Sequence, residues 1–186
     1  MRRSKAIIGI VGAIACPSIL FPLLNRRNEP YWEVWGGEWV NPTQRAFARR
    51  CIRFGQRWGN RGHTLASLAW NESSLGASVK HMEESYGPFG ISTRTAYSHL
   101  PHLRGQSKST ALRVALEEDF EFSADIALEI FNGNYRLFLR KGYRNGMALV
   151  NAAKMYNMGN NWRRAATYGH KFQSRVSWLI QEFPHL

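Results

Sequence analysis

From Asn41 onward, the apolar residues of this chain recur with the period of an α-helix, and no segment alternates for more than a few residues as a half-buried strand would. The pattern is strongest over residues 110–131, and Gly133 is expected to interrupt that helix. Asn41-Pro42 supplies a cap and a first-turn proline for an earlier helix. Further helices are predicted at residues 63–73, 147–158 and 172–183. The sequence therefore predicts a mainly helical domain over residues 41–186.

The helix that follows Asn41 is amphipathic and has a basic outer surface. Its apolar face is predicted from Phe47, Cys51, Phe54 and Trp58. We interpret Cys51 as a small buried hydrophobic residue. The other faces carry arginines, which we interpret as solvated: Arg45, Arg49, Arg50, Arg53 and Arg57.

The composition favours one globular domain with an anionic partner. A chain of 186 residues suits a compact domain with an appendage, and its apolar (44%) and aromatic (13%) residues are sufficient for a core. The net charge of +12 points to nucleic acid, a membrane surface or an acidic cell-wall polymer. Cys16 and Cys51 form no disulfide framework, and no residues have metal-ligand spacing. We therefore expect no metal and no cofactor.

Residues 6–24 form an apolar stretch with basic residues on both sides. Its 19 residues are just long enough to cross a bilayer as a helix. Three interpretations are open: a signal anchor, a cleaved secretory peptide, and a lipoprotein signal with the lipid on Cys16. We favour the anchor and assign residues 1–27 to an N-terminal membrane anchor or signal segment. All three interpretations place the rest of the chain at or across a membrane.

Residues 28–40 contain four large aromatic residues around Gly36-Gly37, which predicts an aromatic linker. The rings are Tyr31, Trp32, Trp35 and Trp39. They can lie at a membrane interface, where amphipathic rings are favoured, or pack onto the domain. The sequence leaves both possibilities open.

Glu72 is the residue that most suggests chemistry. It ends an apolar run that includes Leu68, Ala69 and Trp70. Partial desolvation disfavours the charged form of a carboxyl group, and a general acid that works near neutral pH needs to keep its proton. Taken alone, Glu72 is better explained as an exposed carboxylate in the last turn of a helix, because most glutamates are solvated.

Two later segments change that balance. Glu72-Ser73 is followed by Gly87-Pro88-Phe89-Gly90-Ile91, then by Thr95-Ala96, and far downstream by Ala152-Ala153-Lys154-Met155-Tyr156-Asn157-Met158-Gly159. With these three segments in this order, residues 61–178 resemble the soluble lytic transglycosylase family. The family has a catalytic Glu-Ser at a helix end, then Gly-x-x-Gln-hydrophobic and Thr-Ala, a long helix, and Ala-x-Tyr-Asn-x-Gly.

The resemblance implies a mainly α, lysozyme-like α+β fold and cleavage of the β-1,4 bond between N-acetylmuramic acid and N-acetylglucosamine in peptidoglycan. Glu72 would be the sole catalytic carboxylate, first the general acid and then the base that helps close a 1,6-anhydro ring. Ser73 would lie near the substrate's N-acetyl group. Tyr156 and Asn157 would hold that group and the glutamate in position. The loop-rich region 75–104 would form one wall of the substrate groove.

One residue departs from the family pattern. Gly90 stands where the family usually has glutamine, so no side-chain contact to the sugar is available there. Phe89 is expected to wall the groove by stacking on a sugar ring, next to Ile91. The glycines of this segment allow the backbone to approach a ligand closely.

Alternative functions remain open. Glu83 or Glu84 could position a water molecule and give a hydrolytic lysozyme, since inverting glycosidases use a second carboxylate. Asp119 and Glu121 are expected to be solvated or to serve the fold. A non-catalytic cell-wall-binding protein is a further possibility. A nucleic-acid-binding membrane protein is another, although we expect no specific nucleic acid.

The expected partners are peptidoglycan glycan strands, the membrane through residues 6–24, and a phage virion or a secretion assembly. The catalytic domain is expected to face the periplasm or cell wall, anchored or exported, or to be virion-associated. Such an enzyme would open the wall locally, during phage entry, lysis or secretion.

Overall fold

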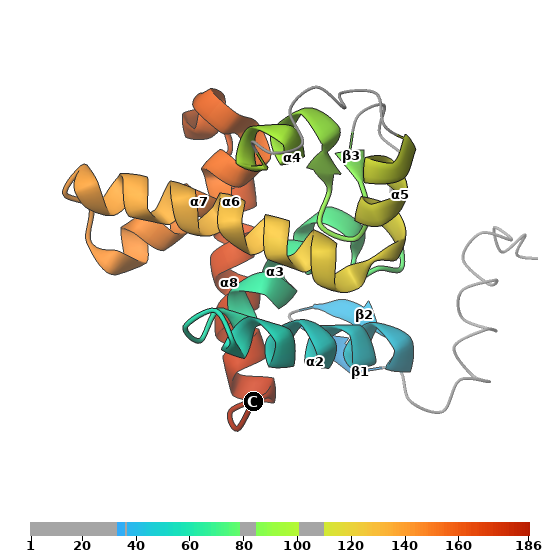
Figure 1. Ribbon diagram of the computed structural model, residues 1–186. Coiled ribbons are helices and arrows are strands. Elements are labelled where there is room, and N and C mark those ends of the chain that lie inside the picture. Colours follow the sequence, from blue (N-terminus) through green and yellow to red (C-terminus); the bar gives the residue numbers. More distant parts are fainter. Residues whose placement is uncertain (1–32, 36, 79–84, 101–109) are drawn as a thin grey trace, which may run out of the picture. The chain divides into compact units, whose positions relative to one another are not determined.

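The computed structural model describes residues 33–35, 37–78, 85–100 and 110–186. The expected anchor or signal segment at 1–27, with Cys16, lies outside these residues. None of the described helices is long and apolar enough to cross a membrane. The elements along the chain (Figure 1) are β1 (Glu33–Trp35), β2 (Glu38–Val40), α2 (Pro42–Gln56), α3 (Gly62–Ser73), β3 (Ser85–Tyr86), β4 (Ile91–Ser92), α4 (Thr93–His99), α5 (Thr110–Glu118), α6 (Phe120–Arg140), α7 (Asn145–Met158), the 3-10 helix η2 (Gly159–Arg164) and α8 (Ala166–Glu182).

The described chain is mainly helical, as predicted. Its strands form two short antiparallel pairs, β1 with β2 and β3 with β4. The second pair and α4 lie within the region 75–104, which was expected to be rich in loops with strands that are short at most. The short strands are confirmed, and α4 is an addition that the glycines and prolines of this region concealed.

The β1–β2 hairpin is part of the folded unit that runs from Glu33 to Leu186. Trp35 is only 1% exposed and packs its ring against Trp70, Trp178 and Phe183. The assignment of residues 33–35 and 37–40 to a linker is therefore corrected, and Trp35 follows the second of the two possibilities, packing onto the domain. Burial of this indole provides the hydrophobic free energy that holds the hairpin.

Helix α2 begins where the sequence predicted. The Asn41 side chain accepts a hydrogen bond from the Gln44 backbone N–H (2.8 Å), and the Gln44 side chain accepts one from the Asn41 N–H (2.9 Å). This reciprocal pair is a capping box. Cys51 lies on the inner face and is fully buried, which confirms it as a core residue, and burial raises the pKa of its thiol.

Two predicted helix boundaries are wrong. The break in the long apolar pattern falls at Asp119 rather than at Gly133, and α6 continues through Gly133 to Arg140. Asp119 caps α6 by accepting a hydrogen bond from the Phe122 N–H (3.0 Å), so its expected role in the fold is confirmed. Helix α8 begins at Ala166, six residues before the predicted start at Phe172.

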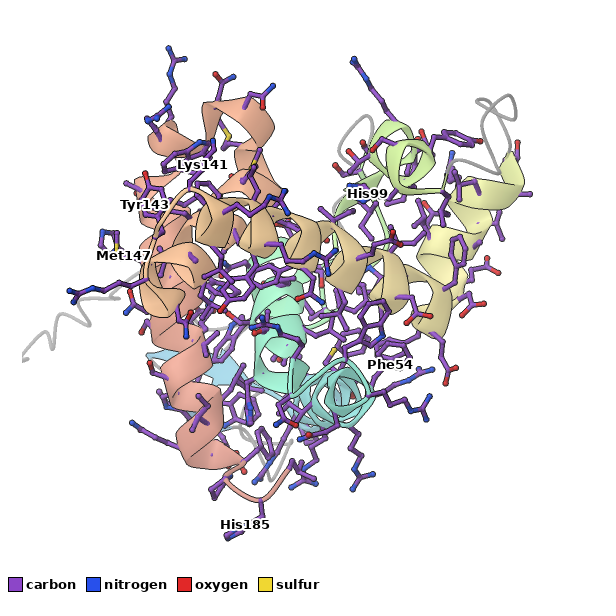
Figure 2. All side chains as sticks on the ribbon, turned by 60° about the vertical axis from the view of Figure 1, so that its left-hand side comes forward. Phe54, His99, Lys141, Tyr143, Met147 and His185 are labelled. Atoms are coloured by element: carbon purple, nitrogen blue, oxygen red, sulfur yellow. The ribbon has the colours of Figure 1, made fainter. Side chains whose placement is uncertain are left out.

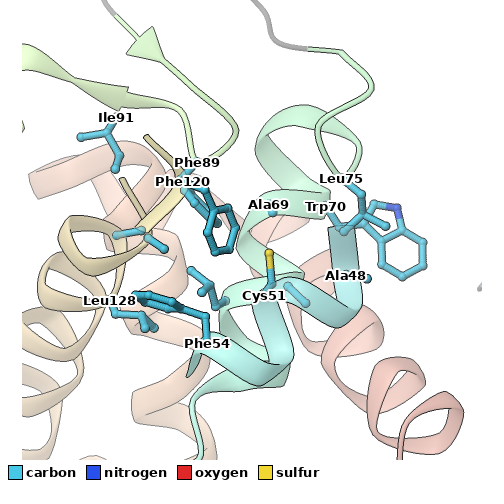
Figure 3. Packing of buried hydrophobic residues seen from close by; sticks show 14 of the residues in the cluster. Ala48, Cys51, Phe54, Ala69, Trp70, Leu75, Phe89, Ile91, Phe120 and Leu128 are labelled. Atoms are coloured by element: carbon cyan, nitrogen blue, oxygen red, sulfur yellow. The ribbon is translucent and has the colours of Figure 1, made fainter. Parts of the chain in front are cut away.

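Helix α3 is the centre of the core. It contacts α2, α6 and α8 (Figure 1; Figure 2). Its apolar residues Leu65, Ala66, Leu68 and Ala69 are completely buried. Figure 3 shows Ala69 facing the cluster that includes Cys51, Phe89 and Phe120. A helix enclosed in this way can place its last turn only where the surrounding elements leave room.

The close approach of α2 and α3 depends on two glycines. A Cβ at Gly55 would lie 2.6 Å from the Gly62 Cα, and a Cβ at Gly62 would overlap the backbone carbonyl of Ile52. Backbone atoms cannot yield as the end of a flexible side chain can. These glycines therefore fix the distance between the two helices.

We expect Gly62→Ala to lower the free energy of unfolding by about 2–3 kcal/mol, the upper part of the range for overpacking a core, because its Cβ would meet backbone atoms. Gly133→Ala is the matched control, because Gly133 is also helical but the nearest atom to its Cβ would be 3.9 Å away. Gly133→Ala should leave the free energy of unfolding unchanged or raise it by up to about 1 kcal/mol, because alanine has the better helix propensity. Urea unfolding measures both. Equal effects of the two substitutions would show that the packing of α2 on α3 is looser than described.

Candidate active site

Glu72 lies in the last turn of α3, half-buried, at the edge of a cavity of ≈ 360 Å³. The cavity brings together residues from α3, β3, the turn between β3 and β4, α7 and α8. The described residues that line it are Asn71, Glu72, Ser85, Gly87, Gly90, Tyr156, Asn157 and Tyr168. The structure thus brings together Glu72, Gly90, Tyr156 and Asn157, all predicted site residues.

Tyr168 holds the Glu72 carboxylate. Its hydroxyl donates a hydrogen bond of 2.6 Å to Oε1 of Glu72. Burial raises the pKa of Tyr168 well above its usual value, and the negative charge of Glu72 raises it further. The tyrosine therefore keeps its proton and stays a donor. A short hydrogen bond from a neutral hydroxyl to a charged oxygen is among the stronger ones in proteins.

Tyr156 supports the turn between β3 and β4 rather than the carboxylate. Its hydroxyl donates to the backbone carbonyl of Phe89 over 2.8 Å. The pKa of Tyr156 is raised, first by burial and then by the nearby charge of Glu72. Tyr156 is thus a neutral donor that ties the end of α7 to the turn that faces Glu72.

Gly90 makes room for the carboxylate. Its φ of +60° lies in the left-handed region that side-chain-bearing residues rarely adopt. A Cβ at this position would lie 2.6 Å from Oε2 of Glu72 and 3.2 Å from its Cδ. Here the family's glutamine would have to displace the glutamate. Gly90 is therefore required by the arrangement of this site.

Ser73 is buried and is not among the residues that line the cavity. Its Oγ lies 2.8 Å from the Pro88 carbonyl and 3.0 Å from the Ala69 carbonyl, and accepts a hydrogen bond from the Gly76 N–H (2.9 Å). Ser73 was expected to lie near the substrate's N-acetyl group, but its side chain does not reach the cavity. Ser73 instead connects the end of α3 to the turn that carries Gly90.

The predicted role of Phe89 is wrong. Its side chain is completely buried, with its ring centroid 5.9 Å from that of Phe120 and 6.4 Å from that of Phe47. An enclosed ring cannot stack on a sugar. Ile91 is also buried, at 2% exposure. The turn between β3 and β4 is held in front of Glu72 because the side chains of Phe89 and Ile91 are buried in the core.

Sequence reasoning missed Tyr168 and Asn71. Tyr168 lies four residues before Phe172, so continuing the apolar pattern of α8 by one turn would have placed it on the helix. Asn71 directly precedes Glu72, and its Oδ1 accepts a hydrogen bond from Arg175 of α8. No motif marks it; only the fold brings Arg175 to it.

The hairpin reaches this network through Glu38. Its carboxylate accepts hydrogen bonds from Arg175 and from Trp70 Nε1, the latter over 2.9 Å. Burial would raise the pKa of Glu38, but these hydrogen bonds and the positive charges of Arg175 and Lys171 outweigh it and lower the pKa. Because Arg175 binds both Glu38 and Asn71, the hairpin braces the residue next to Glu72.

The described residues contain no group of three or more His, Cys, Asp or Glu that could hold a metal ion. Glu83 and Glu84, the candidates for a water-activating base, lie outside the described residues, although Ser85 beside them lines the cavity. Comparisons of the chain with protein-family models, curated protein sequences and solved structures found no match.

The contact between Gly90 and Glu72 can be tested without reference to activity. We expect Gly90→Ala to destabilise the fold more than Gly142→Ala does, by about 1–2 kcal/mol, the cost of overpacking. Gly142 also has a positive φ, of +82°, but no atom lies within 4 Å of its Cβ position. It therefore controls for backbone strain.

The same comparison in a Glu72→Ala background completes a double-mutant cycle. Removing the carboxylate should abolish the excess cost of Gly90→Ala and leave the cost of Gly142→Ala unchanged, as measured by urea unfolding. An undiminished excess would mean that the side chain of Glu72 does not lie against Gly90.

Proposed function

We propose that this protein is a peptidoglycan lytic transglycosylase with Glu72 as its general acid and base, on a lysozyme-like fold. The observation that carries the proposal is the Glu72 carboxylate at a cavity, with Oε1 bound by Tyr168 and Oε2 beside the Gly90 backbone. The order of the Glu-Ser, Gly87–Ile91 and Tyr156-Asn157 segments supports the same activity.

The proposed chemistry uses this geometry. Because Oε1 accepts the Tyr168 hydrogen bond, we assign the transferable proton to Oε2. Glu72 donates it to the glycosidic oxygen, and the bond between that oxygen and C1 of the muramyl residue breaks. The carboxylate so formed takes the proton of the muramyl C6 hydroxyl, whose oxygen bonds to C1 and closes the 1,6-anhydro ring. The proton returns to Glu72, so one residue completes the cycle.

A single carboxylate is enough for this reaction. Most glycosidases use two, one of which activates or replaces water, but families that use a group of the substrate do not need the second. Among the described residues that line the cavity, Glu72 is the one carboxylate. The remaining polar groups are neutral, and Asn157 and Ser85 suit the amide and hydroxyl groups of a sugar.

A hydrolytic lysozyme on the same fold is the second candidate. It is favoured by one observation: Ser85 lines the cavity and directly follows Glu83 and Glu84 in the chain. If either carboxylate held a water molecule on the far side of the sugar, the product would carry a reducing end. The third candidate, a non-catalytic cell-wall-binding protein, would retain the cavity without cleavage.

The proposed setting follows from the sequence. We place the catalytic domain in the periplasm or at the cell wall, anchored through residues 6–24 or exported. A phage virion or a secretion assembly that opens the wall locally is the proposed context. Attraction to the anionic wall by a net charge of +12 is consistent with this location.

We expect Glu72→Gln to lower the release of soluble products from purified sacculi by at least about 100-fold, the contribution typical of general acid–base catalysis. The fold should be retained, because glutamine keeps the shape of the side chain. Glu118→Gln is the matched control, because Glu118 is exposed at the end of α5 and does not line the cavity. The Glu118→Gln protein should therefore keep the activity of the unaltered chain.

Mass spectrometry of the products decides between the candidates. Anhydro-muramyl ends from the unaltered chain support the transglycosylase, and reducing ends would assign the hydrolase and direct attention to Glu83→Gln and Glu84→Gln. Full activity in the Glu72→Gln protein would refute both enzymatic proposals. Binding to sacculi without any product would leave the wall-binding protein.

We expect Tyr168→Phe to reduce kcat by about 10- to 100-fold, because a hydrogen bond to a charged group contributes about 1.5–3 kcal/mol. Tyr168 acts through Glu72 as a positioning residue, so KM should change by less than about twofold if substrate binding is separate. Tyr135→Phe, on α6, removes a hydroxyl outside the cavity and should change neither constant. A rise in KM with unchanged kcat would instead place Tyr168 in substrate binding.

A further inference from the structure

We propose that the arginine groove binds a flexible phosphodiester polymer without bases, such as a polyol-phosphate chain. The groove is formed by Arg49, Arg50 and Arg53 of α2 and by Arg57, the C-cap of this helix, together with Phe54, Phe120 and Glu121. The groove is a second cavity, of ≈ 430 Å³, and it shares no lining residue with the cavity at Glu72. The inference does not depend on the proposed catalytic activity.

The arginines lie on one side of α2. Arg49, Arg53 and Arg57 follow one another at intervals of four residues, which places them about 6 Å apart along the helix axis. Arg50 lies three residues before Arg53. All four are exposed. A helix face of this kind presents a row of charges suited to a chain that carries repeated anionic groups.

The guanidinium groups are available to a ligand. Within the part of the chain that the structure describes, Arg45 is the residue of α2 with ion pairs, to Glu33 and Glu182, and the four groove arginines have none. Glu121 is the one described carboxylate among the lining residues. The groove therefore carries a local excess of positive charge.

Aromatic rings hold three of these arginines in place. The Arg50 guanidinium carbon lies 3.9 Å from the centroid of the Phe120 ring, that of Arg57 5.7 Å from Phe54, and that of Arg49 5.6 Å from Phe183. Cations over aromatic faces at such distances are attracted to them. A side chain that is already oriented loses less entropy when it binds, and a guanidinium group pairs well with phosphate oxygens.

The same rings argue against nucleic acid as the ligand. Proteins that bind single strands stack the bases on exposed aromatic rings. Phe54 and Phe120 are each only 7% exposed, so the groove offers no platform for bases. A rigid duplex is too wide to lie inside a cavity of ≈ 430 Å³ and would touch the arginines only from outside it. A flexible chain of phosphodiesters without bases satisfies both conditions.

The test measures binding of the full-length chain to labelled poly(glycerol phosphate) across a series of salt concentrations. One variant replaces Arg49, Arg50, Arg53 and Arg57 with Gln. The matched control replaces Arg136, Arg140, Lys141 and Arg144 with Gln. The control removes the same charge from exposed positions in and after the C-terminal part of α6, none of which lines the groove. Figure 2 labels Phe54 and Lys141 on opposite sides of the view.

We expect the groove variant to lose about 3 from the slope of log affinity against log salt, at about 0.7 for each phosphate contact of a flexible strand. Between about 50 and about 200 mM salt, the unaltered chain should then lose roughly 60-fold more affinity than the groove variant. The control variant should keep the slope of the unaltered chain. If the groove variant does not fold, Arg53→Gln alone should lower the slope by about 0.7.

Four results would overturn the proposal. Equal losses in the two variants would mean that only net charge matters. Competition by inorganic phosphate as strong, per phosphate, as that by the polymer would exclude a polymer site. Equal or tighter binding of single-stranded DNA would assign a base-bearing ligand. Groove-dependent binding to vesicles that contain anionic lipid, with none to the polymer, would assign a membrane surface. Because none of these measurements uses cleavage, they stand or fall separately from the activity of Glu72.

Discussion

The enclosure of α3 is the constraint on which the rest of the structure depends. Its middle residues are fully buried, and packing against α2 at Gly55 and Gly62 fixes its position. The helix therefore delivers Glu72, in its last turn, to one place only. A carboxylate at the C-terminal end of a helix is also close to the negative end of the helix dipole, which is unfavourable. The hydrogen bond from Tyr168 of α8 offsets this for the carboxylate that Glu72 becomes when it gives up a proton, and it joins an element from the far end of the chain to the site.

The part of the site that could be predicted is the part written in local sequence. The apolar run before Glu72 lies within α3, and the cap at Asn41 acts on α2 alone. Each is a signal within a single helix, and both helices were placed correctly. The break at Asp119 was missed because α5 and α6 bury the same face, so the apolar period continues across it. Tyr168 was missed because α8 starts without a side-chain cap at Ala165, so that the apolar period is the one local signal that reaches back to the first turn of the helix.

The error at Phe89 has a different origin. A residue in a short turn can point either way, and the choice depends on what lies beneath it. Here Phe47 and Phe120 provide an apolar floor, so the ring of Phe89 turns inward and its carbonyl is left for Tyr156. The sequence suggests that Gly90 removes a side-chain contact to the sugar, because the family that the chain resembles usually has glutamine there. In three dimensions it is a requirement, since any Cβ would meet the Glu72 carboxylate.

Phe120 connects the two surfaces for which functions are proposed. One of its neighbours is the ring of Phe89, which anchors the turn in front of Glu72, and another is the guanidinium group of Arg50 in the arginine groove. A substitution of Phe120 would therefore disturb the turn in front of Glu72 and the arginine groove together, and could not distinguish the two proposed functions. Replacing the exposed arginines leaves this ring in the core. The packing of Phe120 thus fixes the spacing between the two surfaces. Their functions have to be tested separately by replacing charged residues, because a substitution in the core would affect both.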